Sequence, residues 1–165
     1  MQKAVFLDRD GTINKDFGYV YKPEDFCFLD GVIEGLRLLQ EAGFLLIVIT
    51  NQSGIARGYY TEEEYLKLEQ YVDETLRKEG VHLTQTYHCP HLDEDCSCRK
   101  PKTGLFYQAA KDWDIDFSES YAIGDKERDL CICREQPVEG ILVAAGTGFE
   151  NLYEAAKYIC NNGKK

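Results

Sequence analysis

The chain has 165 residues, a length typical of one domain, and 44% of them are apolar. This composition excludes an intrinsically disordered protein and supplies a hydrophobic core. The net charge of −10 argues against nucleic-acid binding. No apolar stretch reaches the length of a membrane span, and the chain starts without the parts of a signal peptide. We therefore expect a cytoplasmic protein that binds no membrane.

The first half of the chain alternates between strand and helix patterns. Residues 4–7 are an apolar run that predicts a buried strand. Apolar residues on one face predict a helix over 31–41, and the apolar run 44–49 predicts a second strand. Thr61 to Glu64 match a capping box, which predicts a helix that begins there and ends near Glu79.

The second half continues the alternation. Residues 88–103 have no periodic pattern, and a helix is predicted over 104–112. Strands are predicted over 121–123 and 141–143, and a last helix begins near Glu150. This order predicts an α/β fold in which helices cover both faces of a Rossmann-like parallel sheet. We expect residues 1–165 to form a single domain.

Polar residues follow the predicted strands at their carboxyl ends. Asp8 and Asp10 follow the first strand, Thr50 and Asn51 end the second, and Asp125 follows the third. Ligands of parallel α/β sheets bind beyond the carboxyl ends of the strands. We therefore expect these three stretches to meet in one crevice.

The segment Asp8-Arg9-Asp10-Gly11 carries two carboxylates two residues apart. One carboxylate can attack phosphorus while the other protonates the leaving oxygen. Gly11 lets the backbone turn closely around a phosphoryl group. The alternative interpretation is an ordinary acidic turn after a strand.

Two further stretches fit an anionic substrate. Arg99 and Lys100 precede Pro101, which we expect to start a helix, and Lys102 adds a third cation. In an acidic chain, such a cluster favours anion binding over a solvated basic spot. Asp125 suits Mg²⁺, which prefers oxygen ligands. The nearby Asp129 either orients a metal-bound water or only begins a helix.

A second metal site is predicted within 88–103. An odd number of cysteines, seven, argues against a disulfide framework. His88 lies outside the Cys-x-His pattern, and the Cys131-Ile132-Cys133 pair would point to different helix faces. The predicted ligands of a structural zinc ion are Cys89, His91, Cys96 and Cys98.

Residues 6–12, together with the stretches around Thr50, Lys100 and Asp125, resemble the signature of the haloacid-dehalogenase superfamily. The resemblance runs from residue 6 to about residue 129 and implies a fold without a large cap. It implies that Asp8 forms an aspartyl-phosphate and that Asp10 serves first as acid and then as base.

The same resemblance implies the remaining roles at the crevice. Asp8, the backbone carbonyl of Asp10 and Asp125 would hold Mg²⁺. Thr50 and Lys100, joined by Arg99, would hold the phosphoryl oxygens.

Loop sequences are similar to the branch that contains heptose bisphosphate phosphatases and histidinol-phosphate phosphatases. Segments 16–20 and 53–58 resemble the heptose enzymes and imply a small phosphorylated sugar as substrate. Arg57 would bind its distal phosphate. The implied substrate-binding residues are Asp16, Gly18, Tyr19, Asn51, Gln52, Ser53, Arg57 and Lys126.

Three departures keep alternatives open. Phe17 stands where the heptose enzymes usually have His, the loop between His91 and Cys96 is short, and residues 144–146 lack a usual Arg. Histidinol phosphate or another sugar or polyol phosphate is the alternative substrate. A binding module without turnover would most simply have lost Asp8 or Asp10, and a phosphomutase needs a large cap. We expect a monomer.

Overall fold

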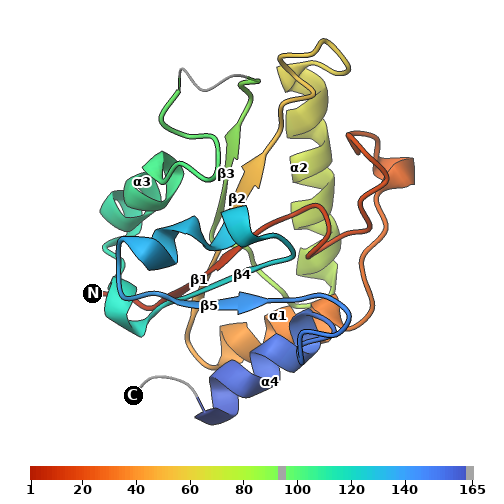
Figure 1. The fold of residues 1–165 in the computed structure, drawn as a ribbon. Helices are drawn as coiled ribbons and strands as arrows, with labels where there is room; N and C mark the ends of the chain where they lie inside the picture. The colour runs from red at the N-terminus through yellow and green to blue at the C-terminus, as the bar shows by residue number, and fades with distance from the viewer. Residues whose placement is uncertain (93–95, 163–165) are drawn as a thin grey trace.

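A parallel sheet of five strands forms the centre of the fold in a computed structural model that describes residues 1–92 and 96–162 (Figure 1). The strand order is β3-β2-β1-β4-β5, and every neighbouring pair is parallel. The predicted α/β architecture is therefore confirmed. The strands are β1 Ala4–Leu7, β2 Leu45–Asn51, β3 Gln85–Cys89, β4 Tyr121–Gly124 and β5 Glu139–Leu142.

Helices cover both faces of this sheet (Figure 1). Val5 and Leu7 of β1 pack in a core with residues of α1, α2 and α4, whereas Ala4 and Phe6 point to the other face, where α3 and the segment around Ile132 cover them. The helices are α1 Val32–Glu41, α2 Glu62–Lys78, α3 Gly104–Trp113 and α4 Leu152–Asn162, with short 3₁₀ helices at Pro23–Asp25, Phe117–Glu119 and Glu127–Arg134.

The amino end of α2 is firmly capped. Thr61 Oγ1 accepts a hydrogen bond from the backbone N–H of Glu64, and Glu64 Oε1 accepts one from that of Thr61. Both bonds satisfy N–H groups that a helix start would otherwise leave unpaired. The predicted capping box is confirmed, and it fixes the position of the chain just before α2.

Three sequence expectations need correction. β3 lies partly in the segment that we expected to be irregular, so Cys89 ends a strand. Strand β5 spans residues 139–142 instead of 141–143. Pro101 does not start a helix, because α3 begins at Gly104. The edge strand β3 escaped notice because Gln85, an exposed residue, and its polar neighbours dilute its apolar pattern.

The predicted zinc loop, 88–103, includes residues 93–95, which lie outside the described residues. Within the described part of the chain, no helix combines the length and the apolarity that a membrane crossing requires.

Candidate active site

A cavity of about 330 Å³ opens at the carboxyl ends of β1 and β2. It gathers every residue that the sequence predicted as catalytic or substrate-binding, and three more that were not on that list: Tyr60, Arg128 and Asp129. The predicted residues that line it are Asp8, Asp10, Asp16, Gly18, Tyr19, Thr50, Asn51, Gln52, Ser53, Arg57, Arg99, Lys100 and Lys126.

Lys100 is buried at the floor of this cavity, with 3% of its surface exposed. Its Nζ lies 2.9 Å from Asp8 Oδ1, 2.8 Å from Asp129 Oδ1 and 2.6 Å from the carbonyl oxygen of Ile49. These three acceptors match the three donors of an ammonium group. Burial alone would lower the pKa of Lys100, but the charges of Asp8 and Asp129 outweigh it and raise the pKa. Lys100 is therefore a fixed positive charge.

The backbone around Lys100 is tied to the end of β2. The side chain of Asn51 donates a hydrogen bond to the Lys100 carbonyl oxygen at 3.1 Å and accepts one from the Lys100 N–H at 2.9 Å. Both ends of the amide are thus used within the protein. Asn51 lines the cavity as predicted, but its contacts hold Lys100 in place.

Three carboxylates meet beside Lys100. Oxygen atoms of Asp8, Asp125 and Asp129 lie within 4.8 Å of one another. Burial, partly offset by the charge of Lys100, raises the pKa of Asp8 to about 7. Burial also raises the pKa of Asp125. When all three carboxylates are ionised, buried Lys100 and half-exposed Lys126, whose Nζ lies 3.6 Å from Asp125 Oδ2, leave one negative charge uncompensated, and the oxygen ligands suit a cation such as Mg²⁺.

Asp125 supplies an independent sign of a cation. Its Oδ1 is buried and has no hydrogen-bond partner among residues 1–92 and 96–162. A buried carboxylate oxygen without a partner is costly unless a cation binds it. Gly11 allows this close approach, because a Cβ there would lie 2.2 Å from Asp125 Oδ2. The residues present therefore fit an oxygen-bound metal ion.

Asp10 is held from several sides. Arg9 Nη2 lies 3.0 Å from Asp10 Oδ1, and Asn14 Nδ2 lies 2.9 Å from the same atom. Gln52 Nε2 donates to Asp10 Oδ2 at 3.2 Å. Arg9 is 5% exposed and also donates to the carbonyl oxygen of Val20, which joins Asp10 to the segment that follows it. The carboxylate is therefore fixed in orientation.

The cations of the cavity surround this floor. In a chain of net charge −10, five basic side chains at one cavity indicate an anionic ligand. The guanidinium of Arg57 lies 5.8 Å from the ring centre of Tyr19, a cation–π contact between the two predicted substrate segments. The five are Arg57, Arg99, Lys100, Lys126 and Arg128.

Lys102 does not belong to this group. Its Nζ donates to the Cys96 carbonyl oxygen at 2.6 Å, and it does not line the cavity. The expectation that Lys102 joins the anion-binding cluster is wrong. The sequence could not distinguish it from Lys100, because the two side chains leave the same short turn in different directions.

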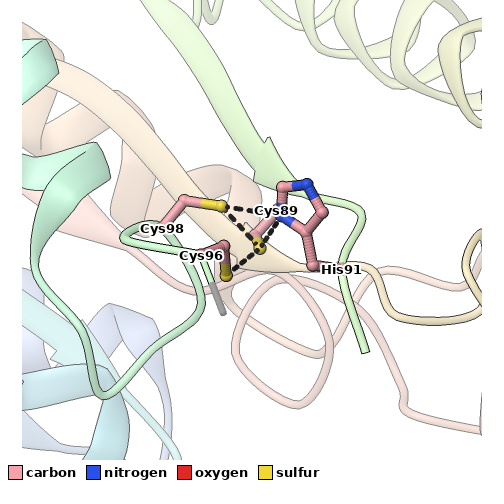
Figure 2. Close-up of side chains that lie close together, drawn as sticks. All are labelled: Cys89, His91, Cys96 and Cys98. Atoms are coloured by element: carbon pink, nitrogen blue, oxygen red, sulfur yellow. Dashed lines mark hydrogen bonds between the residues drawn. The ribbon is translucent and has the colours of Figure 1, made fainter. Parts of the chain in front are cut away.

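The side chains of Cys89, His91, Cys96 and Cys98 point toward one another (Figure 2). Cys89 Sγ lies 3.3 Å from His91 Nδ1 and 3.7 Å from Cys96 Sγ, and His91 Nδ1 lies 3.2 Å from Cys98 Sγ. Four such ligand atoms within 4.8 Å of one another can hold a metal ion.

The surroundings of this cluster support metal binding. Burial acts to raise the pKa of Cys96, but backbone hydrogen bonds from Arg99 and Cys98 lower it to about 6. A thiol with a low pKa is readily a thiolate, the form that binds metal. Burial raises the pKa values of Cys89 and Cys98, so a metal ion would displace the protons of these two thiols when it binds. His88 is directed elsewhere: its ring packs on Tyr65 and its Nε2 faces Glu62.

Asp129 is the main site residue that the sequence left undecided. It is 5% exposed and accepts from both Lys100 Nζ and the N–H of Lys126. Its spacing from Asp125 was the available signal, but an acid at the start of a helix has the same pattern. Tyr60 and Arg128 had no signal of this kind.

A sequence profile of the polynucleotide kinase 3 phosphatase family matches residues 3–130. A D-glycero-beta-D-manno-heptose-1,7-bisphosphate 7-phosphatase of Pasteurella multocida is 44% identical and covers 100% of this chain and 89% of its own. A D-glycero-alpha-D-manno-heptose-1,7-bisphosphate 7-phosphatase of Campylobacter jejuni is 49% identical over 78% of this chain and 74% of its own.

The fold has a similar solved structure. The D,D-heptose 1,7-bisphosphate phosphatase of B. bronchiseptica, crystallised with magnesium and phosphate, superimposes with a TM-score of 0.87. It is 28% identical in sequence, and the match covers 96% of this chain and 98% of that one.

Proposed function

The chain belongs to the haloacid-dehalogenase phosphatases, in the family of the D-glycero-D-manno-heptose-1,7-bisphosphate 7-phosphatases, and we propose that it removes the 7-phosphate of such a heptose bisphosphate. The single observation that carries this proposal is the buried Lys100 ammonium between Asp8 and Asp129 on the floor of a cation-lined cavity. A nucleophilic carboxylate beside a fixed positive charge is what attack on a phosphate dianion requires.

The first step breaks the bond between phosphorus and the sugar oxygen. A carboxylate oxygen of Asp8 attacks phosphorus and forms an aspartyl-phosphate, and the electron pair of the broken bond goes to the leaving oxygen. Asp10 gives this oxygen its proton. Thr50 and Arg99 would bind the phosphoryl oxygens in this step, and the buried charge of Lys100 beside Asp8 would offset the negative charge that develops there.

The second step regenerates the enzyme. Asp10, now a carboxylate, removes a proton from a water molecule, whose oxygen attacks phosphorus. The bond to Asp8 breaks, inorganic phosphate leaves, and the Asp8 carboxylate is restored. The fixed orientation of Asp10 by Arg9 and Asn14 suits a group that must face first the leaving oxygen and then the water.

We propose magnesium for the carboxylate cluster. Asp8 and Asp125 would hold it through side-chain oxygens, Asp10 through its backbone carbonyl, and Asp129 lies close enough to assist. When bound, the ion reduces the repulsion between the anionic nucleophile and the anionic substrate. The unpartnered Asp125 Oδ1 supports this assignment.

We propose zinc for the Cys₃His cluster, in a structural role. Three sulfurs and one imidazole nitrogen fill a tetrahedral coordination shell, which leaves no position for a substrate. Arg99 and Lys100 follow Cys98 directly, so a metal ion there would stiffen the segment that carries both cations into the cavity.

The distal phosphate of the substrate would bind Arg57. Arg57 lines the cavity from the loop after β2, and Tyr19 stands beside it. A guanidinium can bind a phosphate through two hydrogen bonds. Four further lining residues would contact the sugar: Asp16, Gly18, Ser53 and Lys126.

The test is a phosphate-release screen of the purified protein with Mg²⁺. The substrates are both anomers of heptose 1,7-bisphosphate, histidinol phosphate and other small sugar phosphates. We expect the highest kcat/KM for a heptose 1,7-bisphosphate, with phosphate lost from carbon 7. Both anomers are included because the relatives' names contain both. A preference for histidinol phosphate would overturn the substrate assignment and leave the phosphatase mechanism.

We further propose that the protein is a monomer with a single domain that acts in the cytoplasm. Light scattering tests whether it is a monomer.

A further inference from the structure

Gln52 occupies a buried position between the two catalytic stretches. Only 2% of its surface is exposed, although it lines the cavity. Its Nε2 donates to Asp10 Oδ2 at 3.2 Å and to Thr50 Oγ1 at 2.9 Å. Both N–H donors of the amide therefore bond to protein groups.

The carbonyl end of the same amide contacts Tyr60. The hydroxyl of Tyr60 donates to Gln52 Oε1 at 2.5 Å. Tyr60 is 4% exposed, and burial raises its pKa to about 12, so the hydroxyl keeps its proton. All the hydrogen-bonding groups of the Gln52 side chain are thus engaged.

Tyr60 itself is held firmly. Its ring stacks on that of Tyr21 with centres 5.0 Å apart, and the next residue, Thr61, caps α2. The ring packs against Gly54 so closely that a Cβ on that residue would lie 2.2 Å from Tyr60 Cε1. The hydroxyl is therefore presented from a rigid support.

We infer that Tyr60 and Gln52 form a positioning pair, in which the Tyr60 hydroxyl fixes the Gln52 amide so that its NH₂ group faces Asp10 and Thr50. Without the hydroxyl, the buried carbonyl of Gln52 loses its partner. The amide is then held only through its NH₂ group, so it moves more freely and orients the carboxylate of Asp10 less firmly. Tyr60 thereby acts on turnover through Gln52, although it also lines the cavity.

This inference rests on the proposed phosphatase function. The substitution that tests it is Tyr60→Phe, which removes one oxygen and keeps the ring. Tyr87→Phe is the matched control, because Tyr87 is also buried at 5% exposure and donates its hydroxyl to Asp112, outside the cavity lining. Burial raises the pKa of Tyr87 to about 12 as well. The two variants therefore lose comparable hydroxyl groups.

Steady-state kinetics with a generic aryl phosphate and with heptose 1,7-bisphosphate give the main result. We expect Tyr60→Phe to lower kcat by about tenfold, the cost of one buried hydrogen bond, and to change KM less than about twofold. Both variants should lower the melting temperature by similar amounts, but Tyr87→Phe should leave kcat unchanged. Equal kcat values for the two variants, or a change in KM alone, would overturn the inference.

A double-mutant cycle tests whether Tyr60 acts through Gln52. In a Gln52→Ala background, Tyr60→Phe should have no further effect beyond about twofold, whereas additive losses would overturn the pairing. Hydrogen exchange of the Gln52 side-chain amide gives a measurement without turnover: it should be slow in the wild type and faster in Tyr60→Phe, and unchanged exchange would contradict the inference.

The outcomes also separate this inference from the proposed function. A wild type that hydrolyses the aryl phosphate but no heptose bisphosphate would refute the substrate assignment alone. The effect of Tyr60→Phe on kcat would then be measured with the aryl phosphate. A wild type that hydrolyses neither would overturn both.

Discussion

The Nζ atom of Lys100 lies 2.9 Å from Oδ1 of Asp8, although 92 residues separate the two in the chain. Both side chains are buried, with 2% and 11% of the side-chain surface exposed. The ammonium binds one carboxylate oxygen of Asp8 and leaves the other for chemistry. In the proposed reaction, this pair fixes which of the two Asp8 oxygens attacks phosphorus.

The first prediction concerns the nucleophile. Asp8→Asn keeps the shape of the side chain and an oxygen that can accept from Lys100, but an amide cannot attack phosphorus. We expect phosphate release to fall by at least about a thousandfold, with a melting temperature within about 3 °C of the wild type. Comparable release by the variant and the wild type would refute the assignment of Asp8.

The second prediction concerns pH and Mg²⁺. Burial, opposed by Lys100, raises the pKa of Asp8 to about 7, so in the metal-free protein this carboxyl is protonated below about pH 7 and must lose its proton to bind Mg²⁺. The affinity should therefore weaken as pH falls. One proton with this pKa predicts a Kd about tenfold higher at pH 6 than at pH 8, measured by calorimetry.

Asp8→Asn is the control for this measurement. It removes the titrating carboxyl, so most of the difference between pH 6 and pH 8 should vanish while the remaining affinity becomes weaker overall. A wild-type affinity that does not depend on pH would show that Asp8 is not a titrating ligand.

The third prediction concerns zinc. We expect one zinc ion per chain in protein purified without chelators, and Cys96→Ser should lower both zinc content and thermal stability. Structural zinc contributes about 10 kcal/mol in small peptides, and less in a domain with a core of its own. Cys27→Ser, at an exposed cysteine, is the matched control and should change neither. Metal analysis that finds no zinc in repeated preparations would reject the site.

The fourth prediction concerns the distal phosphate. Charged hydrogen bonds of the guanidinium–phosphate kind contribute roughly 1.5–3 kcal/mol, so Arg57→Ala should lower kcat/KM for heptose 1,7-bisphosphate by about 10- to 150-fold. Turnover of a small monophosphate should hardly change, since it has no second anion. Arg37→Ala, an exposed site on α1 beside Glu79, is the control. Equal losses on both substrates would place Arg57 at the transferred phosphoryl group or in the fold.

The sequence predicted that the polar residues of the proposed active site lie together, because parallel strands bring their carboxyl ends to the same edge of a sheet. Asp8, Thr50 and Asp125 follow or end three strands, and that order alone places them in one region. The zinc ligands were predicted from residue type and spacing within a short segment. The zinc ligands are close together in the sequence, and the parallel sheet brings the strand-end residues together.

Other features depend on contacts that no local pattern encodes. Lys100 and Lys102 look alike in sequence, and only the path of the turn sends one to the floor and the other to the Cys96 carbonyl. Tyr60 follows another tyrosine, Tyr59, and nothing in the sequence separates the buried ring from the exposed one. β3 is a short edge strand whose polar residues conceal its period.

Asp8, the proposed nucleophile, follows β1, the middle strand of the sheet, whereas segments 16–20 and 53–58 lie in loops beyond it. The reacting carboxylate is therefore built into the least deformable part of the molecule, and the segments that would choose the sugar are outside it. Evolution or a protein engineer can rewrite those loops to accept a new sugar without redesigning the hydrolytic centre. A combinatorial library confined to them would explore new substrates while the central strands stay unaltered.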